Sequence, residues 1–328
     1  MIIKEVLKKS KLLVNLYECL ARLFERDEMC EQQKIYGLRN CTKKFYVIRA
    51  KREKRGLMGI HDFVLCHILY ALDHGYIPVV DAKNYPNIYH EDGELGVVNI
   101  WEYYFKQPME YGLEDAYKSW YVILSRPRRQ VIPDKYYDMS SHEDIKQYYE
   151  VISHHMQLND KTQQEVDKEE QALRIFAKDG KIIGVCCRGT DYTSLKPTKH
   201  SIPYTAEQTI QLVKEKLKEW DGYKYVYLAT EDEEILDKFI EEFGTDKILY
   251  YVDCKRFPSD TENRTLDEID FDRENDKYLK GLEYLKTIYL LAKCDSAILP
   301  DIGGTLAAVR INGNKYEHTI LIDNGRYE

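Results

Sequence analysis

The sequence predicts an α/β fold made of two Rossmann-like domains, the second built on a doubly wound parallel sheet. Short apolar runs typical of strands alternate with amphipathic stretches typical of helices, most regularly after residue 180. Such alternation indicates parallel strands, because each crossover between them needs a helix-length connection. The 328 residues are also roughly twice the length of an average domain, which indicates two units.

The first half contains a βαβ unit. Two apolar runs, 44–49 (KFYVIR) and 76–81 (YIPVVD), are expected strands, and the turn at 56–59 opens a helix expected to end near Asp73. After Pro108 we expect helical stretches that lead to the end of this half.

Residues 4–25 form a separate amphipathic pattern. Leucine and valine recur there at helical spacing, and lysines occupy the early turns. The pattern predicts a helix that packs on its own domain, and peripheral contact with an anionic membrane surface is the alternative. At the other end of this half, we place the domain boundary near Asp179-Gly180. The predicted domains are therefore residues 1–178 and 179–328.

The second half alternates strands and helices. Its expected strands are 182–187, 223–229, 247–252, 296–299 and 319–322, and its expected helices are 205–220, 233–243, 274–293 and a short one after Gly304. In a doubly wound sheet, ligands bind beyond the carboxyl ends of the strands. The loops that follow these strands are therefore where we expect the functional residues.

Composition excludes several classes of protein. Lys and Arg number 48 against 56 Asp and Glu, and the resulting net charge of −8 repels nucleic acid. The eight cysteines are scattered without C-x-x-C pairs, which indicates free cytosolic thiols rather than a zinc ribbon. No apolar run is long enough to span a bilayer, and the first ten residues carry charges where a signal peptide needs an apolar stretch. We expect a cytoplasmic protein with no transmembrane segment.

The strongest site signal follows the first strand of the second half. The segment 184–192 (GVCCRGTDY) brings Arg188 to the carboxyl end of that strand, beside Gly189 and the pair Thr190-Asp191. A guanidinium can hold a phosphate through two parallel hydrogen bonds, and glycine lets a ligand approach the backbone closely. A salt bridge between Arg188 and Asp191 that only closes the loop is an equally supported interpretation.

Two other strand ends carry compatible residues. The segment 229–232 (ATED) opens a helix, and Thr230 either caps that helix or lies near a ribose hydroxyl. The segment 301–305 (DIGGT) opens another helix, whose first N–H groups and positive dipole end suit a pyrophosphate. Three such loops in one sheet are a stronger signal than any one of them.

These residues resemble a known family. The order G-V-x-x-R-x-T-D, then A-T-D/E-D, then a long helix that ends in C-D-x-x-I/V is similar to the nucleotide-binding half of the α-1,6-fucosyltransferase and protein O-fucosyltransferase superfamily, including the rhizobial chitooligosaccharide enzymes. The resemblance extends over residues 182–327. It implies a GT-B-like fold, a GDP-fucose donor, inversion at the anomeric carbon, and no metal or other cofactor.

The resemblance also implies site residues. Arg188 corresponds to the arginine that holds the donor β-phosphate. The candidate nucleotide-sugar-binding residues beside it are Gly189, Thr190, Lys196, Thr230, Glu231, Asp232, Gly303, Gly304 and Thr305. The motif departs from the family's where Cys186 replaces a histidine and Gly189 replaces a second arginine. A glutamate of the core fucosyltransferases is absent near Lys196, which either supplies replacement charge or is a solvated surface lysine.

Inversion requires a base that takes the proton of the acceptor hydroxyl while the pyrophosphate leaves from the opposite face. Asp191 is nearest in sequence to the phosphate arginine, so Arg188 and Asp191 are the predicted catalytic residues. His200 and Asp301 are the alternative bases, and Asp191 could instead only orient Arg188.

The acceptor is expected to be a glycan that binds to the N-terminal domain. Asn and Asp among aromatic residues offer hydrogen bonds and stacking faces there, although core packing and ordinary loops explain most of these residues equally well. The residues in question are Gly56, Leu57, Met58, Gly59, Asp81, Asn84, Tyr85, Asn87, Tyr89, Trp101 and Tyr104.

Three patterns suggest metal or redox sites and carry less weight. Residues 270–272 spell D-x-D, a manganese motif in other glycosyltransferases, but they lie in an acidic run that a solvated loop explains better. Cys186 and Cys187 are adjacent, yet strand alternation sends their side chains to opposite faces. The helical residues His61, Cys66 and His67 have spacings that do not place all three on one face.

Two other functions compete with an inverting, metal-independent fucosyltransferase. One is a non-catalytic relative that binds a sugar nucleotide or a glycan, which the missing second arginine favours. The other is a D-x-D metal-dependent glycosyltransferase.

Overall fold

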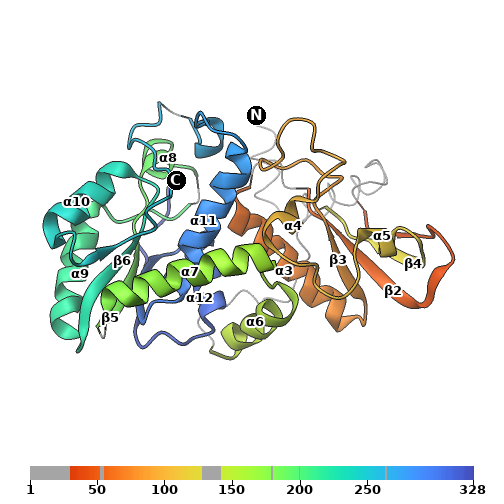
Figure 1. Cartoon of the computed structure of the whole chain (residues 1–328), viewed down its shortest axis with the longest axis horizontal. Coiled ribbons are helices and arrows are strands. Elements are labelled where there is room, and N and C mark those ends of the chain that lie inside the picture. Colours follow the sequence, from red (N-terminus) through yellow and green to blue (C-terminus); the bar gives the residue numbers. More distant parts are fainter. Residues whose placement is uncertain (1–29, 52–54, 128–141, 179, 199, 263) are drawn as a thin grey trace.

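The computed structural model describes residues 30–51, 55–127, 142–178, 180–198, 200–262 and 264–328. They form two sheets surrounded by helices, with helix α11 (Asp276–Ala292) between the sheets (Figure 1). The predicted helix at 4–25 and the boundary residue Asp179 lie outside the described residues. Among the helices of the described part, none is both long and apolar enough to span a lipid bilayer.

The first sheet has four strands in the order β1-β4-β2-β3. The strands are β1 (Gln32–Lys34), β2 (Arg39–Arg49), β3 (Ile77–Asp81) and β4 (Ser119–Leu124), with helices α3 (Leu57–Asp73), α4 (Ile100–Tyr104) and α5 (Leu113–Ala116). β2 pairs in parallel with β3 and β4, and only the edge strand β1 is antiparallel. The βαβ unit predicted from residues 44–81 is confirmed.

Strand β4 corrects the prediction that helices follow Pro108. Residues 119–124 (SWYVIL) are rich in aromatic and β-branched side chains, which favour extended backbone. The strand lies between β1 and β2 in the sheet. Its last three side chains are buried, so tertiary packing supports what the short segment alone does not signal. The helices expected in this region begin later, as α6 (His142–His155) and α7 (Asp160–Ala177).

The second sheet has five strands, all parallel, in the order β7-β6-β5-β8-β9. The strands are β5 (Lys181–Cys186), β6 (Tyr223–Ala229), β7 (Ile248–Leu249), β8 (Ser296–Pro300) and β9 (Thr319–Ile322). The helices are α8 (Thr190–Ser194), α9 (Ala206–Glu219), α10 (Glu233–Phe243), α11, α12 (Gly303–Asn312) and the short 3₁₀ helix η3 (Leu266–Glu268). The sheet is doubly wound, and the two sheets together confirm the expected α/β, GT-B-like fold class.

Two hydrophobic clusters cover the two faces of the second sheet. Cys186 belongs to the cluster that contains α11 and α12, and Cys187 to the cluster that contains α9 and α10. The adjacent thiols therefore lie on opposite faces, as the strand alternation predicts. Burial raises the pKa of both, that of Cys187 to about 12, so both are protonated at neutral pH.

Strand β7 is shorter than predicted. The expected strand was 247–252, but only Ile248 and Leu249 pair with β6. Val252 is 71% exposed, because the chain has left the sheet by that residue. An edge strand of two residues also presents little unpaired backbone to other chains.

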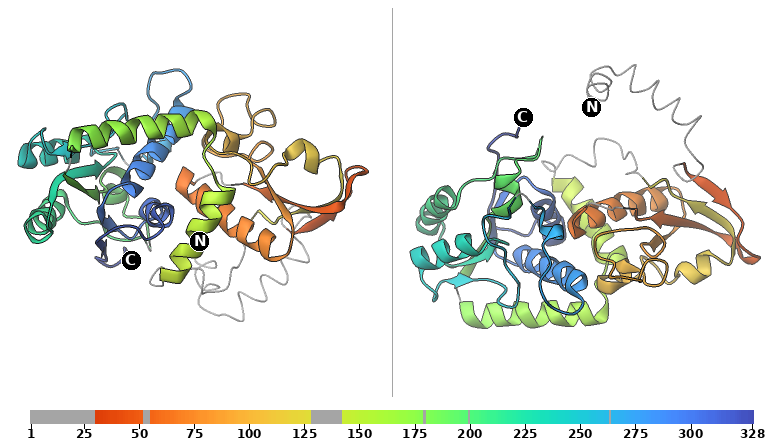
Figure 2. Two further views of the ribbon diagram at one scale, coloured as in Figure 1. Left: turned by 60° about the horizontal axis from the view of Figure 1, so that its bottom comes forward. Right: turned by 90° about the horizontal axis from the view of Figure 1, so that it is seen from above.

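The two halves share one hydrophobic core cluster, which runs from Tyr46 in the first sheet to Leu299 in the second. Helices α3 and α6 pack against α12, and α7 runs from the first half across the second (Figure 2). The Asp62 carboxylate in α3 accepts a 2.6 Å hydrogen bond from Arg310 in α12, and the Arg310 guanidinium lies 4.6 Å from the centre of the Tyr148 ring in α6. This interface therefore contains a buried charge.

His61 is also part of this interface. Its side chain is 1% exposed, and burial lowers its pKa to about 4. His67, on the same helix, places its Nδ1 2.9 Å from the Tyr46 hydroxyl. No group of three or more His, Cys, Asp or Glu side chains in the described part of the chain could hold a metal ion.

Asp62→Asn should destabilise the protein, because it leaves the buried Arg310 charge without its carboxylate. Breaking a buried pair costs about 3–5 kcal/mol, and since the Asp62 side chain is 26% exposed we expect about 2 kcal/mol. Urea unfolding followed by circular dichroism measures this. As a control, Asp160→Asn breaks an ion pair with Lys106 in which Asp160 is 84% exposed, and it should cost less than about 1 kcal/mol. Equal losses in the two variants would contradict a role for the Asp62 pair in joining the halves.

Candidate functional site

The strand order of the second sheet creates a topological switch point between β5 and β8. From β5 the chain adds strands on one side, to β6 and β7, and then crosses over to add β8 and β9 on the other. In doubly wound sheets, the loops on the two sides of such a switch point diverge and leave a crevice at the carboxyl edge, where ligands bind. Arg188 follows β5 and Gly303 follows β8, at the same edge, as predicted.

Arg188 lies at the end of β5 and is paired with a residue from the next strand loop. Its Nε is 3.3 Å from Oε1 of Glu231, which follows β6. Both side chains are 16% exposed, so the pair is mostly shielded from water. The guanidinium also lies over the Tyr192 ring, 4.8 Å from its centre. The structure thus adds Glu231 to the partners that sequence reasoning considered for Arg188.

Two hydrogen-bond donors meet the same carboxylate oxygen. The Gly189 N–H and the Thr190 hydroxyl each donate to Glu231 Oε1 at 3.1 Å. Three consecutive residues therefore direct a guanidinium, a backbone N–H and a hydroxyl at one anionic oxygen. We call residues 188–190 with these donors the anion cradle.

Gly189 is required by the neighbouring carboxylate of Asp232. A Cβ at position 189 would collide with Oδ2 of Asp232. Asp232 is 1% exposed and accepts hydrogen bonds from Thr190 N at 3.2 Å, Ile235 N at 3.1 Å and Ser259 Oγ at 2.6 Å. The second arginine of the resembled motif has no room here, and this explains the departure at position 189.

Asp232 is also the residue that caps α10. Its Oδ1 accepts from the Ile235 N–H, so the predicted alternative that Thr230 caps this helix is wrong. The Thr230 hydroxyl instead accepts from the Asp232 N–H at 3.2 Å, and Thr230 is 4% exposed. An aspartate one turn before Ile235 satisfies the helix N–H more directly than a threonine two residues earlier.

The loop after β8 is built on internal hydrogen bonds. The buried Thr305 hydroxyl donates to the carbonyl oxygens of Pro300 and Ile302, the latter at 2.9 Å. Gly303 is exposed, and a Cβ there would meet open space. A Cβ at Gly304, in contrast, would collide with the Tyr284 hydroxyl. Gly304 is thus needed for packing, and Gly303 leaves the backbone accessible.

Tyr284 is a site residue that sequence reasoning missed. Its hydroxyl touches Gly304, and it lies near Arg188 and Glu231. Burial raises its pKa, although the Arg188 guanidinium acts in the opposite direction, so the phenol stays protonated. A tyrosine in an apolar helix looks like a core residue in the sequence. Only the fold reveals that it contacts the loop after β8 and lies near the loops after β5 and β6.

The remaining predicted site residues lie in the loops after β5 and β8 and have different surroundings. Lys196 is exposed and has a positive φ of 45°. His200 is exposed, and its Nδ1 lies 2.9 Å from the hydroxyl of Tyr192, whose ring is beneath Arg188. Asp301 pairs with Arg326 at 2.6 Å. Asp191 lies in α8, but its side chain is outside the described part of the structure. The roles assigned to these residues stay predictions.

The polar residues of the proposed acceptor side make internal contacts. Asp81 is fully buried and accepts from the Tyr117 hydroxyl at 2.6 Å and from Asn84 Nδ2 at 2.8 Å. The Tyr89 hydroxyl accepts from Leu57 N at 2.7 Å, at the start of α3, and Tyr104 donates to Tyr278 O at 2.9 Å. These contacts hold the loops of the first half, and its role in acceptor binding stays a prediction.

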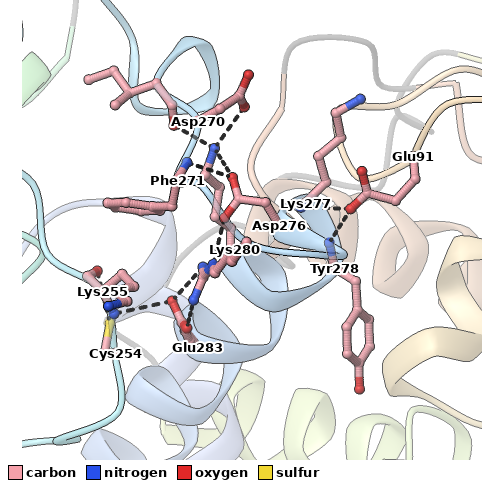
Figure 3. A network of polar contacts seen from close by, with 12 residues as sticks. Glu91, Cys254, Lys255, Asp270, Phe271, Asp276, Lys277, Tyr278, Lys280 and Glu283 are labelled. Carbon is pink, nitrogen blue, oxygen red and sulfur yellow. Dashed lines mark hydrogen bonds and ion pairs between the residues drawn. The ribbon is translucent and has the colours of Figure 1, made fainter.

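Asp270, the first carboxylate of the D-x-D pattern, belongs to an ionic network with residues of α11 (Figure 3). Lys280 reaches Asp270 at 3.3 Å and Asp276 at 2.8 Å, and Arg273 pairs with both Asp276 and Glu283. The Asp270 carboxylate therefore faces a lysine. The network fastens the irregular stretch before α11 to the helix.

No family model matches the chain, and no curated protein matches it. Solved structures similar to it include fucosyltransferase NodZ from Bradyrhizobium (16% identity, 81% of this chain and 92% of that chain covered, TM-score 0.46). Others are POFUT1 in its apo form (10%, 85% and 98%, TM-score 0.41) and a variant of Arabidopsis thaliana FUT1 in complex with GDP (11%, 90% and 72%, TM-score 0.45). All three are fucosyltransferases, the class whose motifs the sequence resembles. At these identities and TM-scores, the likeness assigns neither a substrate nor a catalytic residue to this chain.

Gly304→Ala should destabilise the protein by about 1–3 kcal/mol, because the added methyl group collides with the Tyr284 hydroxyl and overpacks the loop. Gly303→Ala, one residue earlier in open space, is the matched control and should change little. Urea unfolding of both variants measures the difference. Adding Tyr284→Phe to Gly304→Ala removes the colliding oxygen and should recover part of the loss. If the two glycine variants were equally stable, Tyr284 would not pack on this loop as described.

Proposed function

We propose that the protein is an inverting, metal-independent glycosyltransferase that transfers fucose from GDP-fucose to a hydroxyl of a glycan. One observation carries the proposal: an arginine, a backbone N–H and a hydroxyl converge on one anionic oxygen beside the switch point of a doubly wound sheet. Phosphate oxygens are the ligands that such donor sets bind. The identity of the sugar and the base rests on the motif resemblance of the second half.

In the proposed reaction, negative charge develops on the leaving pyrophosphate as its bond to the sugar breaks. Arg188 is already held at the strand end by Tyr192 and its loop, so it can stabilise this charge without a large rearrangement. The first-turn N–H groups of α12, beginning at the exposed Gly303, would take the other side of the same group. Tyr284 is a protonated hydroxyl near both loops and can donate a hydrogen bond.

The acceptor hydroxyl needs a base on the face opposite the pyrophosphate. Asp191 remains the base that we propose, with His200 and Asp301 as alternatives. His200 is linked to the arginine side of the site through the Tyr192 hydroxyl, whereas Asp301 is engaged by Arg326. The glycan acceptor would bind from the first half, across the crevice from the second sheet.

A non-catalytic protein that binds a sugar nucleotide is the second candidate. The observation that favours it is the carboxylate of Glu231 on Arg188, since this pairing offsets the positive charge that catalysis needs. We propose a cytoplasmic location for either function, because the seven cysteines in the described part of the chain are free thiols.

Turnover of GDP-fucose with a mixture of glycan acceptors, with and without EDTA, tests the function. We expect fucose transfer that EDTA does not change, and a larger rise in melting temperature with GDP than with UDP, since a ligand that binds only the folded state stabilises it. Binding without turnover would support the non-catalytic candidate. Stabilisation by UDP that EDTA abolishes would support a metal-dependent enzyme and overturn the proposal.

Arg188→Ala should remain folded and lose most activity. Removing one preorganised donor from a developing oxyanion costs roughly 3–4 kcal/mol, or about a hundredfold to a thousandfold in rate. Arg188→Lys should not restore it, because lysine lacks the planar fork that holds two oxygens. Steady-state kinetics with melting curves measure both. Near-normal turnover by folded Arg188→Ala would remove the phosphate role, and unfolding of this variant would instead indicate a structural role for Arg188.

A further inference from the structure

The anion cradle is occupied by a carboxylate of the protein itself. Glu231 Oε1 receives the Gly189 N–H at 3.1 Å and the Thr190 hydroxyl at 3.1 Å, and it lies 3.3 Å from Arg188 Nε. One anionic oxygen thus accepts two hydrogen bonds and lies in ion-pair contact with a guanidinium, surroundings that a phosphate oxygen would also find favourable. Glu231 reaches this position from the end of the neighbouring strand β6, so its side chain bridges two loops of the crevice edge.

The neighbouring carboxylate is held in a different way. Asp232 is 1% exposed and accepts three hydrogen bonds, from Thr190 N, Ile235 N and Ser259 Oγ. It caps α10 and cannot leave without exposing those donors. In the described part of the structure the Glu231 side chain contacts only the cradle, and it is 16% exposed to solvent. A rotation of its side chain into water would free the cradle without moving the backbone.

We propose that Glu231 is an exchangeable internal occupant of the anion cradle, and that a phosphate group of the ligand binds by displacing it. The assignment of that phosphate to a nucleotide sugar rests on the function proposed above. The exchange replaces one anion by another, so the Arg188 guanidinium is paired in both states. A ligand that must displace Glu231 has a reduced apparent affinity. It equals the affinity for the open cradle multiplied by the fraction of molecules in which the cradle is open.

The opposite role for Glu231 is that of a positioning residue, which holds Arg188 in the geometry that phosphate needs. The two roles predict opposite changes in anion affinity when the Glu231 carboxylate is removed. Removing an occupant strengthens anion binding, whereas removing a positioning residue weakens it. Glu231→Gln separates them, because it keeps the shape of the side chain and removes the charge that competes with phosphate.

The experiment titrates the full chain with inorganic pyrophosphate in a calorimeter. We expect Glu231→Gln to bind pyrophosphate on the order of tenfold more tightly than the wild type, since a charged hydrogen-bond acceptor is roughly twice as strong as a neutral one. Glu233→Gln is the matched control: it removes the same charge two residues away, from an exposed side chain, and should change the affinity less than about twofold. Adding Arg188→Ala to Glu231→Gln should abolish the gain, which places the bound anion in the cradle.

A second variant guards against misfolding of the first. Glu231→Asp keeps the charge but is one methylene too short to span the loops, so it should also bind pyrophosphate more tightly, with an unchanged melting curve. Weaker or unchanged binding in both folded variants would overturn the inference. So would a gain that persists without Arg188.

The outcome is independent of the proposed enzyme activity. If GDP-fucose neither binds nor turns over while the Glu231 variants gain affinity for pyrophosphate, the proposal for Glu231 is supported and the fucosyltransferase proposal fails. If the wild type transfers fucose while Glu231→Gln loses pyrophosphate affinity, the function survives and Glu231 is a positioning residue.

Discussion

Helix α11 is the element on which both halves depend, because it packs at the same time on the second sheet, on α3 and on α7. Its backbone at Gly281 is so close to the Tyr104 hydroxyl that no side chain fits between them. Farther along, the buried Lys286 reaches Glu165 of α7 at 3.4 Å. A helix held from three sides moves little, so the side chain that it places at the site, Tyr284, is preorganised.

Helix α11 holds only one side of the site, the loop after β8. Tyr284 comes from α11 and fixes the loop after β8 by its contact with Gly304. The loops after β5 and β6 are joined instead by the carboxylates of Glu231 and Asp232. One side of the switch point is therefore fixed by packing and the other by charged hydrogen bonds. Charged contacts at a partly exposed position can exchange partners, whereas a packed tyrosine cannot do so without opening a cavity.

The sequence was sufficient for the features that depend on local pattern. Strand and helix alternation predicts the parallel sheet, and the parallel sheet brings Arg188, Glu231 and Gly303 to one edge. It was not sufficient where tertiary contacts decide. Strand β4 is stabilised by β1 and β2 on its two sides, and Tyr284 reaches the loop after β8 only because α11 packs against α12. The pairing of Arg188 with Glu231 joins residues more than forty positions apart, and no spacing rule indicates it.

Asp232 determines both the charge of the site and the need for a glycine at position 189. Asp232 caps α10 and fills the space into which a side chain at position 189 would point. Positive charge therefore cannot be added to the cradle at that position, where the resembled motif carries a second arginine. The charge that remains is that of Arg188, which the structure pairs with a carboxylate. In the exchange that we propose, release of the Glu231 carboxylate frees the positive charge of Arg188 for a pyrophosphate, because the local packing leaves no room to add a second guanidinium.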